Sequence, residues 1–191
     1  MKKVAVLVSG GGTNLQALID NDVPITLVIS SCDDAYALTR AQKNGITAEV
    51  AQWSEYRALP NGRAAFTKHI IGILLQYNID IVVLGGFMVI LDESLCAAYP
   101  RAVVNVHPSL IPAFSGEGYY GLKVHKAALA RGVKVSGATV HYVNEICDGG
   151  EIIAQKAVPV LDGDTPETLQ ARVMQVEREI LPEAVKKIIE I

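Results

Sequence analysis

Short runs of β-branched and other apolar residues alternate with longer amphipathic stretches along the whole chain, and this alternation limits the choice of fold more than any other feature. Runs such as Ile79–Leu84 and Ala102–Val106 are mainly apolar and do not alternate between polar and apolar residues, as expected for strands that helices cover on both faces. The apolar runs predict strands at residues 3–9, 24–30, 46–51, 80–85, 102–106, 137–143 and 151–160. The amphipathic stretches predict helices at residues 13–20, 34–44, 63–77, 122–131 and 166–190. Such an order is typical of βαβ units on a parallel sheet.

The expected fold is therefore α/β. The last predicted helix begins with Thr165 as its cap and Pro166 in its first position, and Pro182 is expected to kink or restart it. The sequence contains no internal repeat, low-complexity tract or linker-like change in composition. We expect a single doubly wound, Rossmann-like domain over residues 1–191, with a mostly parallel sheet of about seven strands, flanking helices and a late antiparallel strand.

Composition argues against several classes of protein. A chain of 191 residues with 50% hydrophobic content suits one well-buried domain. With 19% charged residues, a net charge of -3 and no cluster of Lys and Arg, it is not expected to bind nucleic acid, whereas a small anionic ligand is compatible. Cys32, Cys96 and Cys147 are far apart and lack CxxC spacing. This argues against a disulfide framework or a zinc site and favours a reducing cytoplasm.

The start of the chain, Met1–Gly10, is basic and then apolar. We interpret it as a first strand rather than a signal peptide, because it lacks a small-residue cleavage pattern and continues directly into a glycine turn. No apolar run reaches the length needed to span a membrane, so no membrane partner is expected.

The segment Ser9–Leu15, with three consecutive glycines, lies between the first predicted strand and the first predicted helix. Glycines in this place let backbone N–H groups approach an anion at the helix N-terminus, where the partial positive charge favours phosphate. The spacing matches neither GxGxxG nor the P-loop with its Lys, so a dinucleotide or a nucleoside triphosphate is not favoured. The alternative is a tight turn that needs a positive φ and binds nothing. The segment alone leaves both open.

The segment Gly85–Leu91 follows a predicted central strand, at the sheet edge where open α/β folds bind ligands. Glycines followed by exposed apolar residues would form a slot for a flat aromatic ring, with backbone polar groups at its rim. The alternative, which the local sequence favours, is that Phe87 and Met88 are core residues.

Asn105, His107 and Asp148 are side chains suited to polarising a carbonyl, moving a proton and orienting the proton carrier. Asn105 and His107 are two residues apart on a predicted strand, so they face the same side where the strand ends at Pro108. Taken alone, each segment favours a structural role: a histidine at a strand end and an Asp-Gly-Gly hairpin turn. If that turn folds over the strand end, Asp148 can accept a hydrogen bond from His107 and fix its tautomer.

Two rival interpretations of this region stay open. One is a metal site formed by His107, His141, Cys147 and Asp148. Their spacing fits no established ligand motif well, so metal binding is not expected. The other is a non-catalytic module that binds a phosphorylated sugar through the glycine turn, while Asn105 and His107 are structural.

The ordered set of these segments is more specific than its parts. The glycine turn ending Gly12-Thr13-Asn14-Leu15-Gln16, the Gly-Phe-Met-x-Ile-Leu stretch, Asn-Val-His-Pro-Ser-Leu-Ile-Pro and the Asp148-Gly149-Gly150 turn occur in the order found in folate-dependent formyltransferases. Along nearly its whole length, the chain resembles the group that formylates phosphoribosylglycinamide. The resemblance implies transfer of the formyl group of 10-formyltetrahydrofolate to the amine of 5-phosphoribosylglycinamide in de novo purine biosynthesis. It further implies direct attack through a tetrahedral intermediate, no metal, and a cytoplasmic monomer or homodimer.

The resemblance also assigns roles residue by residue. It implies that Asn105 and a protonated His107 stabilise the oxyanion, and that Asp148 orients His107 and organises proton transfer. The implied contacts to the ribosyl substrate are Gly12, Thr13 and Asn14 for the phosphate and Glu177 for the ribose hydroxyls. The implied folate contacts are Arg63, Met88, Val89, Ile90, Leu91 and Asn105. We accordingly expect a phosphate-binding half at about residues 1–100 and a folate-binding, catalytic half at about residues 101–191.

The chain departs from the family pattern at several places. Val89 stands where Arg is common, Met174 where Gln is frequent and Thr13 where Ser is often found. The segment Glu117–Leu122 is longer than in many relatives and is expected to reshape the cavity mouth. Methionyl-tRNA formyltransferase carries an additional C-terminal domain and formyltetrahydrofolate deformylase an additional N-terminal one. A chain of 191 residues is expected to have room for neither.

Overall fold

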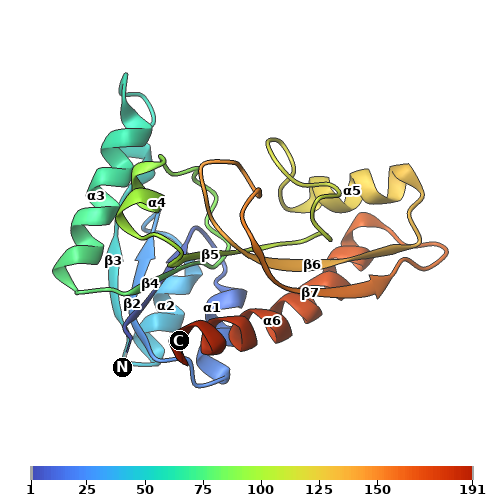
Figure 1. Cartoon of the computed structure of the whole chain (residues 1–191), viewed down its shortest axis with the longest axis horizontal. Helices are drawn as coiled ribbons and strands as arrows, with labels where there is room; N and C mark the ends of the chain where they lie inside the picture. Colours follow the sequence, from blue (N-terminus) through green and yellow to red (C-terminus); the bar gives the residue numbers. More distant parts are fainter. Residues whose placement is uncertain (1, 191) are drawn as a thin grey trace.

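Within residues 2–190, which the computed structural model describes, seven strands form one sheet in the order β3-β2-β1-β4-β5-β6-β7 (Figure 1). The end residues of the expected 1–191 domain, Met1 and Ile191, lie outside the described residues. The strands are β1 Val4–Val8, β2 Ile25–Ser30, β3 Thr47–Val50, β4 Ile81–Leu84, β5 Val103–His107, β6 Val135–Tyr142 and β7 Ile152–Pro159. Every strand predicted from the sequence is present, with ends shifted by no more than a few residues.

The helices are α1 Thr13–Asp20, α2 Tyr36–Lys43, α3 Gly62–Gln76, α4 Ser94–Ala98, α5 Leu122–Arg131 and α6 Pro166–Glu190, with a 3-10 turn, η1, at Trp53–Glu55. The sequence missed α4 and η1, because elements this short do not show a helical period. Pro182 does not restart α6, which continues through it. Pro182 cannot donate a backbone hydrogen bond within the helix. The buried Leu181 and Val185 near it pack against the sheet and keep the helix continuous. No helix between residues 2 and 190 is long and apolar enough to cross a membrane.

The strand directions confirm a doubly wound, mostly parallel sheet. Strands β3, β2, β1, β4 and β5 pair in parallel. In the described chain β6 is the one strand that runs the other way, antiparallel to both β5 and β7. The strand order reverses at β1, which lies between β2 and β4, and such a reversal opens a crevice at the carboxyl ends of the strands.

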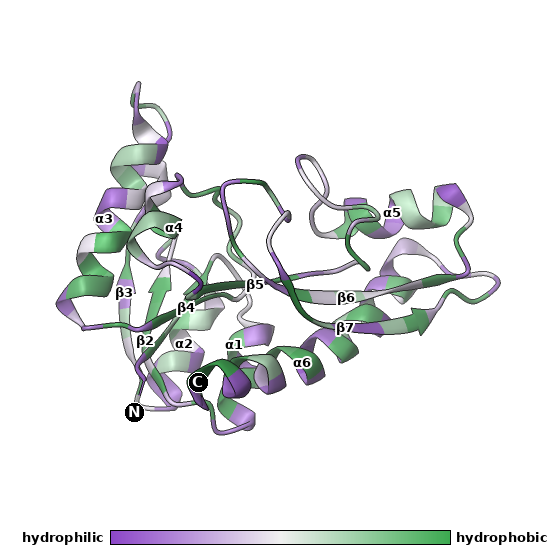
Figure 2. Cartoon of the chain, in the orientation of Figure 1, coloured by the Kyte–Doolittle hydropathy of each residue, from purple (hydrophilic) through white to green (hydrophobic). Residues whose placement is uncertain are grey.

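Helices cover both faces of the sheet (Figure 1). Buried residues of α1, α2, α5 and α6 form one core cluster with Val4, Val6 and Val8 of β1. Buried residues of α3 and α4 form the other cluster with Ala5 and Leu7. Successive residues of β1 therefore face opposite layers, and the central strands are hydrophobic along their length (Figure 2). This rigid double layer fixes where the strand ends, and the loops that follow them, lie.

The crevice brings two of the predicted segments together. The Gly85 N–H donates to the Leu7 carbonyl at 2.8 Å, and the Met88 N–H donates to the Ser9 hydroxyl at 2.9 Å. The glycine turn after β1 and the segment after β4 are therefore hydrogen-bonded neighbours, as expected for the switch point of a doubly wound sheet.

Candidate active site

A cavity of about 1030 Å³ opens at the carboxyl ends of β1, β4 and β5. Its walls come from the segments that follow these strands, from the loop between β6 and β7, and from α6. The predicted site residues that line it are Thr13, Asn14, Arg63, Met88, Val89, Ile90, Leu91, Asn105, Asp148 and Glu177. Gly12 and His107, the other two, lie behind the wall. The cavity is large enough for two small molecules side by side.

At one end of the cavity lies the N-terminus of α1. Gly12 begins the helix with φ 68°, no side chain in the described chain caps it, and its first turn holds no acidic residue. Thr13 and Asn14 line the cavity, so the unpaired N–H groups of the first turn face it. A Cβ on Gly12 would lie 2.7 Å from the Cβ of Ala37. Gly12 therefore makes the turn, and the residues after it present the positive end of the helix.

Glu177 of α6 faces the same end of the cavity. Only 9% of the residue is exposed, and burial raises the pKa of its carboxyl to about 7, although Asn14 and Arg178 lower it. A carboxyl poised near neutral pH can accept hydrogen bonds from hydroxyl groups when it is ionised.

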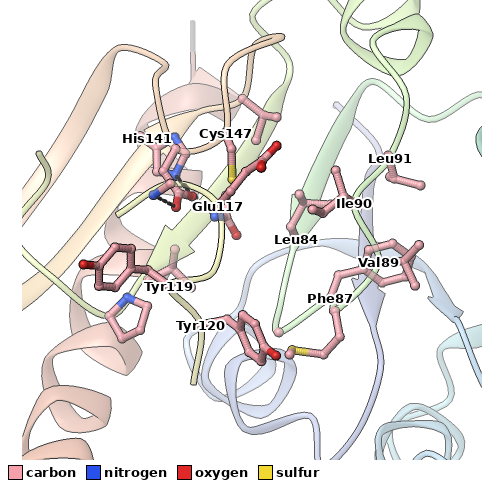
Figure 3. Close-up of a pocket in the computed structure, with 18 of the residues that line it drawn as sticks. Leu84, Phe87, Val89, Ile90, Leu91, Glu117, Tyr119, Tyr120, His141 and Cys147 are labelled. Atoms are coloured by element: carbon pink, nitrogen blue, oxygen red, sulfur yellow. Dashed lines mark hydrogen bonds and ion pairs between the residues drawn. The ribbon is translucent and has the colours of Figure 1, made fainter. Parts of the chain in front are cut away.

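The other end of the cavity is apolar on one side. Leu84, Phe87, Val89, Ile90 and Leu91 form this wall, and the segment with Glu117, Tyr119 and Tyr120 lies opposite (Figure 3). Met88 and Ile90 are 60% and 57% exposed. Apolar side chains left exposed in a concave site indicate a ligand with a flat, apolar part.

The core interpretation is right for Phe87 and wrong for Met88. The ring of Phe87 stacks on Phe66, with centroids 6.4 Å apart, and joins the core under α3. The Met88 backbone instead is tied to Ser9, and its side chain points into the open cavity.

Strand β5 and the loop after β6 bring Asn105, His107 and Asp148 together. His107 Nδ1 lies 3.3 Å from Asp148 Oδ2, and His107 Nε2 donates to the Phe114 carbonyl at 2.9 Å. Both ring nitrogens of His107 thus face groups of the chain itself. In this arrangement His107 does not reach the cavity, whereas Asn105 and Asp148 do.

Asp148 is carried by residues 143–151, a loop longer than the simple hairpin turn that the local sequence favours. The loop closes tightly, because a Cβ on Gly150 would lie 1.7 Å from the Tyr142 carbonyl oxygen. Asp148 accepts a hydrogen bond from the Gly116 N–H at 2.9 Å. Burial raises the pKa of the Asp148 carboxyl, but His141, Gly116 and His107 outweigh burial and hold that pKa below its ordinary value. The site therefore contains a buried, ionised carboxylate.

Two further histidines belong to the site. From the sequence, His141 was considered only as a ligand of the alternative metal site, and His125 was assigned no role. His141 Nε2 lies 3.3 Å from Asn105 Nδ2 and 3.6 Å from Asp148 Oδ1. His125 of α5 also lines the cavity, and neither of its ring nitrogens has a hydrogen-bond partner among residues 2–190. Burial, followed by the charge of His107, lowers the pKa of His125 to about 4. The alternation of β6 could have shown which way His141 faces, but the register against β5 is not visible in a sequence.

In the part of the chain that the structure describes, no group of three or more His, Cys, Asp or Glu side chains is arranged to hold a metal ion. The cluster of His107, His141 and Asp148 is instead held together by ion-pair contacts and hydrogen bonds to backbone carbonyls. The arrangement suits proton transfer and carbonyl polarisation.

Comparison with known proteins decides the family. Residues 2–185 match the family described as Formyl transferase. The chain belongs to the formyl transferase family. A solved structure of glycinamide ribonucleotide transformylase 1 from Symbiobacterium toebii is 41% identical to this formyl transferase and superposes with a TM-score of 0.88, over 97% of this chain and 86% of the other.

Two curated relatives differ in how much of their own length the chain covers. The phosphoribosylglycinamide formyltransferase of Bacillus subtilis is 34% identical over 99% of this formyl transferase and 95% of the relative. The chloroplastic phosphoribosylglycinamide formyltransferase of Vigna unguiculata is 37% identical over 99% of this chain. The chain spans less than two thirds of the length of the plant relatives it matches, and 61% of the Vigna protein.

Proposed function

We propose that this formyl transferase moves the formyl group of 10-formyltetrahydrofolate to the amine of 5-phosphoribosylglycinamide, a step of de novo purine biosynthesis. The names of the Bacillus and Symbiobacterium relatives support phosphoribosylglycinamide as the acceptor. The observation that carries the proposal is one cavity that joins the uncapped N-terminus of α1 to Asn105 and Asp148. A phosphorylated acceptor and an apolar donor placed in it would meet at the polar pair.

The acceptor fits the end of the cavity that α1 and α6 form. The backbone N–H groups at Thr13 and Asn14 suit a phosphate, since the helix dipole favours negative charge there. Glu177 lies on the facing helix α6 and lines the same end, where an ionised carboxyl would accept hydrogen bonds from the two ribose hydroxyls. This arrangement would leave the glycyl amine free to extend towards Asn105.

The formyl donor fits the apolar end. The exposed Met88 and Ile90, together with Val89 and Leu91, would cover the flat pterin ring. Arg63 also lines the cavity and would face the anionic end of the folate. Val89 supplies no charge of its own, so we expect the backbone and Arg63 to hold the donor here.

The chemistry needs a hydrogen-bond donor that stabilises the oxyanion and a group that accepts the proton of the amine. The amine attacks the formyl carbon of the folate, so a new C–N bond forms and the formyl oxygen gains negative charge. When this tetrahedral intermediate collapses, the bond between the formyl carbon and the folate nitrogen breaks, and the folate leaves with a proton on that nitrogen. Asn105 donates an amide N–H to the formyl oxygen. The ionised Asp148 takes the proton that the amine loses, directly or through water, and passes it towards the folate nitrogen. His107 acts through Asp148, because its charge keeps that carboxylate ionised and in place. Holding both substrates together supplies much of the remaining acceleration.

The decisive assay mixes the purified chain with 5-phosphoribosylglycinamide and 10-formyltetrahydrofolate and follows the change in folate absorbance. We expect turnover with this acceptor only. Turnover with charged methionyl-tRNA, or with water alone, would assign the chain to a related reaction. Binding of the ribosyl substrate without formyl transfer would instead support a non-catalytic phosphosugar module. A His69→Gln variant, changed at an exposed position away from the cavity, should react as the wild type does.

We further propose that the reaction takes place in the cytoplasm, with the chain as a monomer or a homodimer. Within residues 2–190 the three cysteines form no disulfide, which is compatible with a reducing compartment. Sedimentation analysis at micromolar concentration would distinguish the two assembly states.

A further inference from the structure

We propose that His141 is a positioning residue that fixes the orientation of the Asn105 amide. In its neutral form, His141 would accept one N–H of the Asn105 amide and leave the other N–H for the formyl oxygen. The proposal rests on the proposed function only for the identity of that oxygen. The geometry that leads to it concerns side chains of this chain alone.

The tautomer of His141 follows from its backbone contact. His141 Nδ1 lies 2.8 Å from the Tyr142 carbonyl oxygen. A carbonyl oxygen only accepts hydrogen bonds, so Nδ1 carries the hydrogen. A neutral imidazole has a single N–H, which leaves Nε2 as a bare acceptor.

The bare nitrogen faces Asn105. Residues Asn105 and His141 are directly opposite one another in the antiparallel pair of β5 and β6, and Asn105 Nδ2 lies 3.3 Å from His141 Nε2. The amide therefore presents its NH₂ group, not its carbonyl oxygen, to the ring. His141 is 1% exposed, so little of its ring is open to water. The sheet register thus sets the direction of the amide.

His107, which lies on the same strand as Asn105, gives the contrasting case. His107 Nε2 donates to the backbone carbonyl of Phe114, as His141 Nδ1 donates to that of Tyr142. The other ring nitrogen of His107, Nδ1, faces the carboxylate of Asp148 at 3.3 Å. A carboxylate accepts and cannot donate, so a hydrogen on Nδ1 would complete this contact and would give the ring a positive charge. One buried carboxylate balances one imidazolium, so in our proposal His141, whose contact with Asp148 is the longer one at 3.6 Å, is the neutral ring. In this proposal the two histidines have different roles: His107 carries charge beside Asp148, and His141 orients the Asn105 amide.

The orientation matters for the reaction. An amide has a donor end and an acceptor end, and only the donor end stabilises a developing oxyanion. With the carbonyl end turned into the cavity, Asn105 would repel that charge. Removing His141 frees the amide to rotate, so a variant keeps Asn105 but loses part of its effect on turnover.

Steady-state kinetics of three variants test the proposal. His141→Leu should lower kcat by roughly 100-fold, the effect of losing an oxyanion donor, with KM for both substrates changed less than about threefold. His141→Gln places an amide oxygen near the position of Nε2 and should recover most of kcat. His69→Gln is the control for loss of a histidine and should leave kcat unchanged. Normal turnover in His141→Leu, or equal losses in the Leu and Gln variants, would overturn the proposal.

A double-mutant cycle separates action through Asn105 from action through Asp148. If His141 works through Asn105, His141→Leu should add almost nothing to the loss in Asn105→Ala. The same change should multiply the loss in Asp148→Asn. The opposite pattern would assign His141 to the carboxylate and overturn the proposal.

A spectroscopic measurement on the wild-type chain does not depend on activity or on the folding of any variant. Long-range ¹H–¹⁵N correlation spectra at pH 7.5 should show His141 as the neutral Nδ1–H tautomer. An Nε2–H tautomer or an imidazolium would overturn the proposal, since either one would turn the Asn105 amide round. If the wild type shows this tautomer but no formyl transfer, the proposed function fails while the positioning contact stands.

Discussion

His107 Nδ1 lies 3.3 Å from Asp148 Oδ2, and the two side chains are only 5% and 9% exposed. Little of either side chain is open to solvent, so the Coulomb attraction between them is weakly screened. The pair joins β5 to the loop between β6 and β7, which are brought together only in the folded sheet. The contact with His107 therefore holds the Asp148 carboxylate in place and also favours its ionised form.

Replacement of Asp148 by Asn should lower kcat by about 100-fold or more, because an amide can neither accept the proton from the amine nor balance the charge on His107. Binding of the ribosyl substrate should change little, since its phosphate lies at the α1 end of the cavity. Stopped-flow absorbance for turnover and isothermal titration for binding measure the two effects separately. Asp162→Asn, at an exposed position outside the cavity, is the matched control. Equal loss of binding and turnover in Asp148→Asn would contradict the assignment.

The elements of the fold follow from the sequence because they depend on local hydrophobic patterns. Strands β1 and β4 are continuous apolar runs, and α6 is opened by Thr165, whose hydroxyl accepts the Thr168 N–H at 3.3 Å. Helix α4 could not be predicted, because its five residues are shorter than two turns. The continuation of α6 through Pro182 depends on packing against the sheet, which local propensity does not include.

The site could be predicted only in part. The types and order of Asn105, His107 and Asp148 were informative, but the enclosed position of His107 depends on the Phe114 carbonyl, a backbone group without a sequence signal. His141 enters the site through the register of β5 against β6. Register depends on long-range pairing, so it emerges only with the assembled sheet.

Gly12→Ala should destabilise the protein by about 2 kcal/mol, because an alanine at a left-handed φ is strained and its Cβ meets α2. The new Cβ would lie 2.7 Å from that of Ala37. Gly45→Ala is a matched control, since Gly45 has a similar φ of 66° but nothing within 4 Å. Urea unfolding of both variants should show the larger loss at Gly12. Equal losses would mean that the contact with Ala37 relaxes without cost.

His125 should make the free energy of unfolding depend on pH. Its pKa is about 4 in the folded chain, below the ordinary 6.5, so the unfolded chain binds a proton that the folded chain does not. The stability it contributes is therefore present above pH 6.5 and lost as the pH falls towards 4. Between pH 7.5 and 5 the loss should be about 2 kcal/mol. Urea titrations of His125→Leu should lack this loss, whereas His69→Gln should retain it. An unchanged pH dependence in His125→Leu would contradict the assignment.

Glu177 should release a proton when the ribosyl substrate binds. In the free chain its pKa is about 7, so close to half of the molecules carry a protonated carboxyl at pH 7. Ribose hydroxyls that donate to the carboxylate favour the ionised form, so the pKa falls on binding and up to about half a proton leaves. Isothermal titration in two buffers with different ionisation enthalpies measures this number. Glu177→Gln should bind the substrate roughly tenfold or more weakly and release fewer protons, while any release from the substrate phosphate is common to both proteins. Equal release from the two proteins would place the ribose elsewhere in the cavity.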